Sequence, residues 1–220
     1  MKEEMTPKEW KKQLELFERE RGEFISKQSF NRRFGLLKEF IEFAVVSGRV
    51  LDIGCGSGDF KRFSNLENYV GIDPIALNTK DFLFVQGIGE YLPFRDGIFD
   101  CAVSMAALDH CLDPVKIFDE CKRVLKDSGR FYIWLSVIRT DPRYKIKRAL
   151  YYLSTFEIRS LIRSLRANIN IFGKDKRRLG QEYGHTYSFT ETSLIEFISK
   201  YFKIEKVGLH DQDVFIAVRK

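Results

Sequence analysis

The stretch that decides the fold is Val-Leu-Asp-Ile-Gly-Cys-Gly-Ser-Gly, residues 50–58. An apolar run ends here in three glycines at alternate positions, Gly54, Gly56 and Gly58. Glycine has no Cβ, so it allows both a tight turn and the close approach of a ligand to the backbone. The pattern predicts a buried strand that turns into a helix, with a ligand packed against the turn.

Three other interpretations of this loop compete. A dinucleotide-binding fingerprint needs glycine at its sixth position, where this sequence has Asp59, and a carboxylate there would repel a pyrophosphate. A phosphate-binding P-loop needs a Lys-Ser/Thr pair after the glycines, which this sequence lacks. A turn without a ligand would use one or two glycines. The loop therefore favours a ligand other than a dinucleotide or a nucleoside triphosphate.

Short apolar runs on the C-terminal side of the loop predict the rest of a sheet. They are residues 68–73, 82–85, 99–105 and 130–137, followed by 202–209 and 213–220. The last two runs lie close enough to form an antiparallel hairpin at the sheet edge. Helices are predicted from the N-cap Asp113 to Leu125 and from near Thr190. Strands separated by helical or loop crossovers indicate a mainly parallel sheet.

Two helices are predicted ahead of the first strand. Thr6 and Pro7 have the residue types of a helix start. The second helix has an apolar face that includes Phe34, Leu37 and Ile41, and Ser47-Gly48 is its predicted stop.

The composition fits one α/β domain. The chain has 220 residues, of which 44% are hydrophobic and 31% charged. No apolar run approaches the ~18 residues that a bilayer crossing needs, and the N-terminus lacks the apolar stretch of a signal peptide, so we expect a cytoplasmic protein. The four cysteines form no CxxC pair, and we expect reduced thiols and no metal site.

The net charge of +6 is unevenly distributed. Residues 139–183 hold 12 Lys or Arg and 4 Asp or Glu, an excess of +8, which leaves −2 for the remainder. Most basic segments are ordinary solvated surfaces. If this one is functional, it would attract an anionic small molecule, a lipid surface or RNA.

With Asp52 ahead of its glycines, the loop resembles motif I of the class I S-adenosylmethionine-dependent methyltransferases, in the type 11-like group that includes quinone-biosynthesis C-methyltransferases. The resemblance continues in order through Tyr-Val-Gly-Ile-Asp-Pro at 69–74, the segment 86–100 and the segment 102–135. Each motif is weak alone, whereas four in the correct order and spacing are specific.

The resemblance implies an α/β fold: a Rossmann-like three-layer sandwich around a seven-stranded, mostly parallel sheet with an antiparallel C-terminal strand. It implies S-adenosylmethionine as cofactor, with Asp73 bonded to both ribose hydroxyls. The other implied contacts come from the glycine loop and from the ends of the next strands: Asp52, Gly54, Cys55, Gly56, Gly58, Pro74, Gly87, Ile88, Gly89, Glu90, Ser104, Met105 and Ala106.

One position departs from the family pattern. The family often has an acid after the first glycine of the third motif, for the adenine amino group, and this sequence has Ile88. We expect Ile88 to pack on the adenine face, with backbone groups of residues 87–90 making the polar contacts.

Methyl transfer from a sulfonium mainly requires alignment and exclusion of water, and a general base is optional. His110 is the best candidate for a base because it follows the fourth strand on the expected substrate side, and Asp109 is the second. A role for His110 in capping the next helix or shaping the pocket is the alternative.

His185 and Tyr187 lie in a stretch that is near the substrate in related enzymes. A loop held by aromatic packing would explain the same residues.

We therefore expect an N-terminal helical extension at 1–47, a cofactor-binding domain at 48–138 and 186–220, and a basic helical insertion at 139–185 that serves as a substrate lid. The predicted function is methyl transfer to a small-molecule acceptor, of which an anionic one is a candidate. An RNA or protein methyltransferase and a non-catalytic cofactor-binding regulator remain alternatives. Nucleic acid is not favoured, because no recognisable RNA-binding module is present.

Overall fold

The computed structural model describes residues 27–111, 113–139, 141–143, 187 and 189–220, with single positions at 11, 15, 146 and 150. Side chains of the first described helix are included from Phe34 onwards. The predicted helix at Thr6, almost all of the basic insertion and His185 lie outside the described residues.

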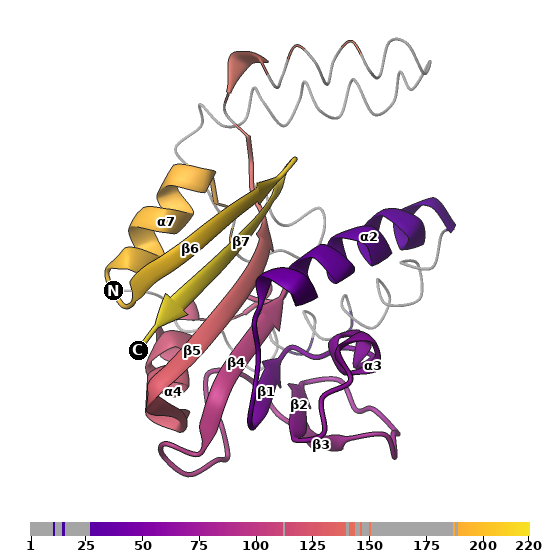
Figure 1. Cartoon of the computed structure of the whole chain (residues 1–220), viewed down its shortest axis with the longest axis vertical. Coiled ribbons are helices and arrows are strands. Elements are labelled where there is room, and N and C mark those ends of the chain that lie inside the picture. The colour runs from indigo at the N-terminus through magenta and orange to yellow at the C-terminus, as the bar shows by residue number, and fades with distance from the viewer. Residues whose placement is uncertain are drawn as a thin grey trace.

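Seven strands form one sheet in the order β3-β2-β1-β4-β5-β7-β6 (Figure 1). Strands β1 to β5 pair in parallel, and β7 runs antiparallel to both of its neighbours. The strands are β1 Val50–Ile53, β2 Tyr69–Asp73, β3 Leu83–Gln86, β4 Phe99–Met105, β5 Leu125–Ser136, β6 Lys203–His210 and β7 Asp213–Arg219. The predicted sheet and its C-terminal hairpin are confirmed.

Helices cover both faces of this sheet. They are α2 Lys27–Phe43, α3 Asp59–Ser64, α4 Pro114–Val124 and α7 Glu191–Ser199. Buried residues of α4 and α7 join one apolar cluster, and those of α2 and α3 join another on the opposite face. Strands β1 and β2 are buried along their whole length, as parallel strands covered on both sides must be. The predicted three-layer sandwich is confirmed.

Two helix starts follow from local capping chemistry. Asp113 Oδ1 accepts a hydrogen bond from Val115 N at 3.0 Å, and Pro114 occupies the first helical position of α4. Thr190 caps α7 through a reciprocal bond pattern with Ser193. Both starts agree with the sequence prediction.

The predicted end of α2 at Ser47-Gly48 is wrong, because the helix ends at Phe43. Gly48 has a φ of +73°, and a Cβ at this position would overlap the Asp100 side chain. Asp100 Oδ2 accepts a hydrogen bond from Arg49 N at 2.8 Å. Glycine is therefore needed at position 48 for the entry into β1.

The last parallel strand also begins earlier than predicted. The apolar run starts at Arg130, whereas β5 starts at Leu125, directly after α4. Leu125 pairs with Phe99, and a register shift separates this pair from the regular ladder that starts at Cys101. Among the helices that the structure describes, none is long and apolar enough to span a bilayer.

Candidate active site

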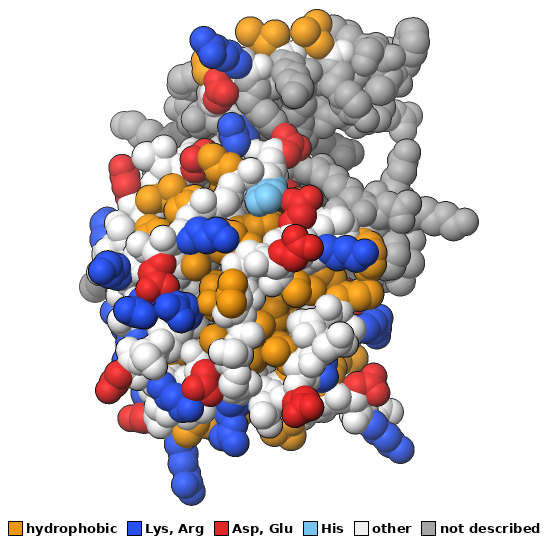
Figure 2. Space-filling view, in the orientation of Figure 1, with side chains coloured by type: hydrophobic (Ala, Val, Ile, Leu, Met, Phe, Trp, Pro, Cys, Tyr) orange, Lys and Arg blue, Asp and Glu red, His pale blue; other side chains and the backbone are white. Residues whose placement is uncertain are grey.

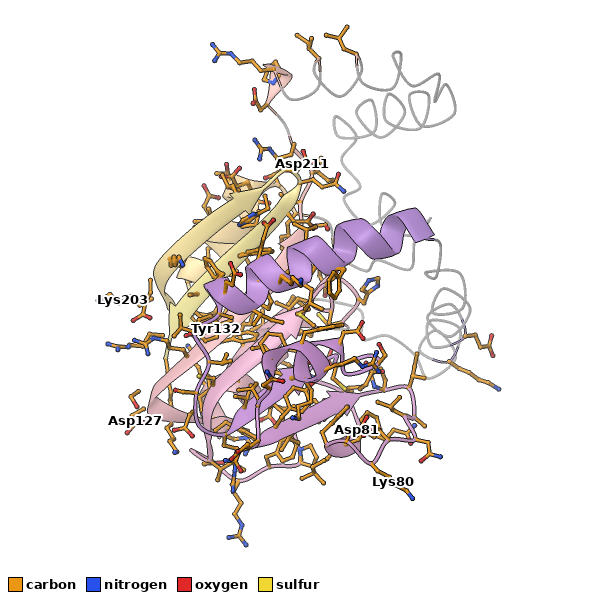
Figure 3. All side chains as sticks on the ribbon, turned by 45° about the vertical axis from the view of Figure 1, so that its right-hand side comes forward. Lys80, Asp81, Asp127, Tyr132, Lys203 and Asp211 are labelled. Atoms are coloured by element: carbon orange, nitrogen blue, oxygen red, sulfur yellow. The ribbon has the colours of Figure 1, made fainter. Side chains whose placement is uncertain are left out.

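The predicted site residues that the structure describes gather at the carboxyl ends of the parallel strands. Asp211, at the turn after β6, marks this edge of the sheet, and Asp127, at the start of β5, marks the opposite edge (Figure 3). The chain passes from β1 to β2 on one side, whereas β4 lies on the other side of β1. Such a reversal of strand order leaves a crevice at the carboxyl ends of the strands, where open α/β sheets bind their ligands.

The glycine loop leaves β1 at this crevice and begins α3. Gly54, Gly56 and Gly58 have φ values of +74°, +52° and +78°. Gly54 N and Cys55 N both donate to Ile72 O, at 2.8 and 3.1 Å, which ties the loop to β2. A Cβ at Gly56 would have no heavy atom within 4 Å, so this backbone faces open space that a ligand can fill.

The neighbouring glycines are required for packing. A Cβ at Gly54 would overlap the Ala107 Cβ, and one at Gly58 would overlap the Phe82 ring. The loop is thus packed on both sides and open at its middle glycine, as a cradle for a ligand requires.

A pair of glycine substitutions tests this distinction. Gly54→Ala should lower the free energy of unfolding by about 1–3 kcal/mol, because it adds both a collision and a left-handed backbone strain. Gly35→Ala, on the exposed side of α2 with nothing within 4 Å, should raise it by roughly 0.5–1 kcal/mol. Urea unfolding measures both changes. An unchanged or higher free energy of unfolding for Gly54→Ala would contradict the structural role of Gly54.

Asp73 links the ends of the first two strands. Its Oδ2 accepts a hydrogen bond from Gly56 N, and its Oδ1 accepts one from Ile75 N, both at 2.9 Å. A carboxylate offers about four acceptor positions, of which these two bonds use two. Asp73 therefore shapes the loop and retains acceptor capacity for two hydroxyl donors. Pro74 follows it and its carbonyl accepts a bond from Gln86 Nε2.

The segment after β3 lies beside Asp73. Gly87 N donates to Asp73 O at 3.0 Å, and a Cβ at Gly89 would lie 2.8 Å from Ile53 Cγ2. Ile88 is half-buried. Glu90 is buried and its Oε1 accepts a bond from Asp113 N at 3.2 Å. Glu90 therefore supports the start of α4, whereas the proposed adenine contacts of this segment stay a prediction.

An arginine fixes the chain that continues from this segment. Arg123 of α4 donates to the carbonyl oxygens of Leu92 and Phe94, at 2.8 and 2.7 Å. It also forms ion pairs with Glu120 and Asp96 at 2.7 and 2.8 Å. Arg123 thus holds the loop between β3 and β4 against α4, together with Glu120, which accepts a hydrogen bond from Leu92 N at 2.7 Å.

The end of β4 forms the other wall of the crevice. Ser104 is buried and its Oγ donates to Ile53 O at 3.1 Å, so its hydroxyl joins β4 to β1. Met105 is partly buried next to it. Ala106 has a φ of +50°, in the left-handed region that costs an L-residue roughly 1–2 kcal/mol. Such strain is often found at ligand sites.

The structure brings His110 together with Asp109 and Tyr187. His110 Nε2 lies 3.8 Å from Asp109 Oδ1, and the His110 side chain is 24% exposed. Tyr187 N donates to Asp109 O at 3.0 Å, although the two residues are far apart in sequence. The Tyr187 ring stacks on Phe189. The predicted base and one predicted substrate residue thus share one side of the crevice.

A buried acid lies beneath the glycine loop. Asp52 is fully buried, and its Oδ2 accepts a hydrogen bond from the Tyr69 hydroxyl at 2.5 Å. Burial raises the pKa of Asp52 to about 7, although the bond from Tyr69 lowers it. Tyr69 was not among the predicted residues, and only the need of a buried carboxylate for a donor could have indicated it.

A hollow of about 500 Å³ lies at the opposite edge of the sheet, where the strands begin. Asp100 in its lining is already paired with Lys126 and bonded to Arg49 N. This hollow is far from the glycine loop, and switch-point geometry favours the other edge.

Comparisons with known proteins cover the segment that contains the glycine loop. Residues 51–133 match the family model described as a methyltransferase domain. The chain is 37% identical to the uncharacterized protein MJ1252 of Methanocaldococcus jannaschii over 121 residues, 51% of this chain and 47% of that protein. It is 29% identical to the demethylmenaquinone methyltransferase of Thermotoga maritima over 119 residues, 49% of this chain and 52% of that enzyme. The chain spans about half the length of these relatives.

A solved structure shares the fold. It is the Burkholderia thailandensis 1,6-didemethyltoxoflavin-N1-methyltransferase with bound S-adenosylhomocysteine and 1,6-didemethyltoxoflavin, with a TM-score of 0.60 and 15% identity, covering 98% of this chain and 90% of that one. The family match covers β1 and the glycine loop through most of β5. Residues 51–133 therefore match a methyltransferase domain, and the fold around them is shared with a solved methyltransferase structure.

Proposed function

We propose that this chain transfers the methyl group of S-adenosylmethionine to a small-molecule acceptor. The observation that carries the proposal is the Asp73 carboxylate, which anchors the glycine loop and keeps acceptor positions for a pair of hydroxyls. The residues present fit the cofactor, because the backbone at Gly56 is open where a ribose and methionine moiety would lie. When bound, the cofactor supplies an activated methyl group on a sulfonium.

Two observations favour a small acceptor. The relatives described above carry small acceptors in their names, a demethylmenaquinone and a didemethyltoxoflavin. On the face shown in Figure 2, basic and acidic side chains of the described residues are interspersed, so a polyanion bound there would meet carboxylates as well. The substrate lid at 139–185 is part of the same proposal, with an anionic acceptor as its candidate ligand.

Incubation with methyl-labelled cofactor and a fractionated cell extract tests the acceptor class. Label is expected in the small-molecule fraction. Label in the RNA or protein fraction would contradict the small-acceptor proposal. Cofactor binding by calorimetry without transfer to any fraction would instead indicate a regulator.

We further propose His110 as the general base that removes a proton from the acceptor. Its imidazole is partly exposed, and Asp109 Oδ1 lies 3.8 Å from His110 Nε2, where it would stabilise the charge that the ring gains. His110→Ala should lower the transfer rate about 100-fold with unchanged cofactor affinity. His210→Ala is the matched control, because His210 lies on β6 and is paired with Glu39 at 2.6 Å. Equal transfer rates for His110→Ala and His210→Ala would exclude His110 as the general base.

A further inference from the structure

Asp52 and Tyr69 form a buried, hydrogen-bonded pair beneath the glycine loop. Asp52 lies on the same side of β1 as Val50, facing the α2 and α3 layer, and none of its side chain is exposed. Its Oδ2 is bonded to the Tyr69 hydroxyl at 2.5 Å. Among the residues that the structure describes, none donates a hydrogen bond to Oδ1. An ionised carboxylate is poorly satisfied in such a place.

The charges around Asp52 are of its own sign. Asp73 at the end of β2 and Asp59 in the first turn of α3 both disfavour the charged form, and the Tyr69 hydroxyl is the group that favours it. The pKa of Asp52 is therefore raised to about 7, mainly by burial. Near neutral pH, both the protonated and the ionised form of Asp52 are therefore accessible in the ligand-free protein.

A positive charge bound nearby would shift the equilibrium between the protonated and ionised forms of Asp52 towards the ionised form. Asp52 lies two residues before Gly54, in the strand that ends at the crevice. S-adenosylmethionine carries a positive charge on sulfur, and the demethylated product has a neutral thioether. Inside a protein a charge acts over longer distances than in water. The bound cofactor therefore favours the ionised form of Asp52 through its positive charge, whereas the neutral thioether of the product does not.

We propose that Asp52 discriminates between the cofactor and its demethylated product by releasing its proton to solvent when the positively charged cofactor binds. The inference rests on the proposed cofactor site and adds a pH-dependent selectivity to it. The sign follows from linkage: below neutral pH, cofactor binding must displace the proton and is weakened, whereas product binding is not. Raising the pH from 6 to 8 should therefore increase cofactor affinity several-fold relative to product affinity.

Calorimetry in two buffers of different ionisation enthalpy at pH 7 tests the proposal on the unmodified protein. Binding of S-adenosylmethionine should release up to about half a proton more than binding of S-adenosylhomocysteine. Asp52→Asn should abolish this difference. Tyr69→Phe removes the bond that favours the charged form, so it should move the pH midpoint of the affinity ratio upwards.

Equal proton release with both ligands in the unmodified protein would overturn the inference and leave the cofactor site intact. A difference that persists in Asp52→Asn would assign the proton to another group and would also overturn it. If neither ligand binds at all, the proposed function fails together with the inference.

Discussion

Asp73→Ala is expected to weaken binding of S-adenosylmethionine and S-adenosylhomocysteine at least about 100-fold. The substitution removes a carboxylate acceptor for two hydroxyls, and charge-assisted hydrogen bonds contribute about 1.5–3 kcal/mol each. It also removes the acceptors of Gly56 N and Ile75 N, so the loop keeps only its backbone bonds to Ile72 of β2. Isothermal calorimetry with both ligands measures the effect.

Asp81→Ala is the matched control for this change. Asp81 is an exposed acid just before β3, labelled in Figure 3, and its removal changes the net charge by the same amount. The Asp81→Ala protein should bind S-adenosylmethionine and S-adenosylhomocysteine with the same affinities as the unmodified protein. A folded Asp73→Ala protein that binds the cofactor as tightly as the control would refute the site assignment.

Phe40→Ala is expected to lower the free energy of unfolding by about 3–5 kcal/mol. Phe40 is completely buried between α2 and the sheet. Its ring contacts those of Phe60 on α3, Trp134 on β5 and Phe215 on β7. Truncation would leave a cavity where α2, α3, β5 and β7 meet. Equilibrium unfolding in urea provides the measurement.

Phe63→Ala removes the same side chain from a site that is 38% exposed. It should cost less than half as much, since water already reaches that ring and less apolar surface is lost from the core. Equal losses for both variants would show that Phe40 does not join α2 to the sheet. The Tyr132 hydroxyl, which donates to Val45 O at 3.0 Å, holds the segment after α2 independently (Figure 3).

The sequence alone predicts a structural feature when the residues that determine it are close together in the chain. The glycines of the loop and the caps at Asp113 and Thr190 lie within a few residues of the structure they determine, and all were predicted. Asp73 was expected because residues 69–74 resemble the second motif of the methyltransferase family, at that motif's spacing from the loop. Its bond to Gly56 N gives a physical reason for that spacing.

The remaining features depend on contacts between distant residues. The bond from Tyr69 to Asp52 joins two strands, and the need for Gly48 comes from Asp100. Glu90 was expected near the adenine, and the structure places its carboxylate on Asp113 N. These pairings become visible only when the register of the sheet is known, because no short motif encodes them.

The position of β7 between β5 and β6 has a consequence for synthesis. Trp134 pairs with Phe215, about eighty residues later, and among the described strands β6 pairs with β7 alone. Until β7 has been made, a growing chain presents β5 as an open edge that another strand could occupy. The native pairing of β5 with β7 must wait until this distant segment has been synthesised. The pairing is therefore a slow folding step during which β5 can associate with a wrong strand. Chaperone dependence during translation should therefore concentrate on this edge.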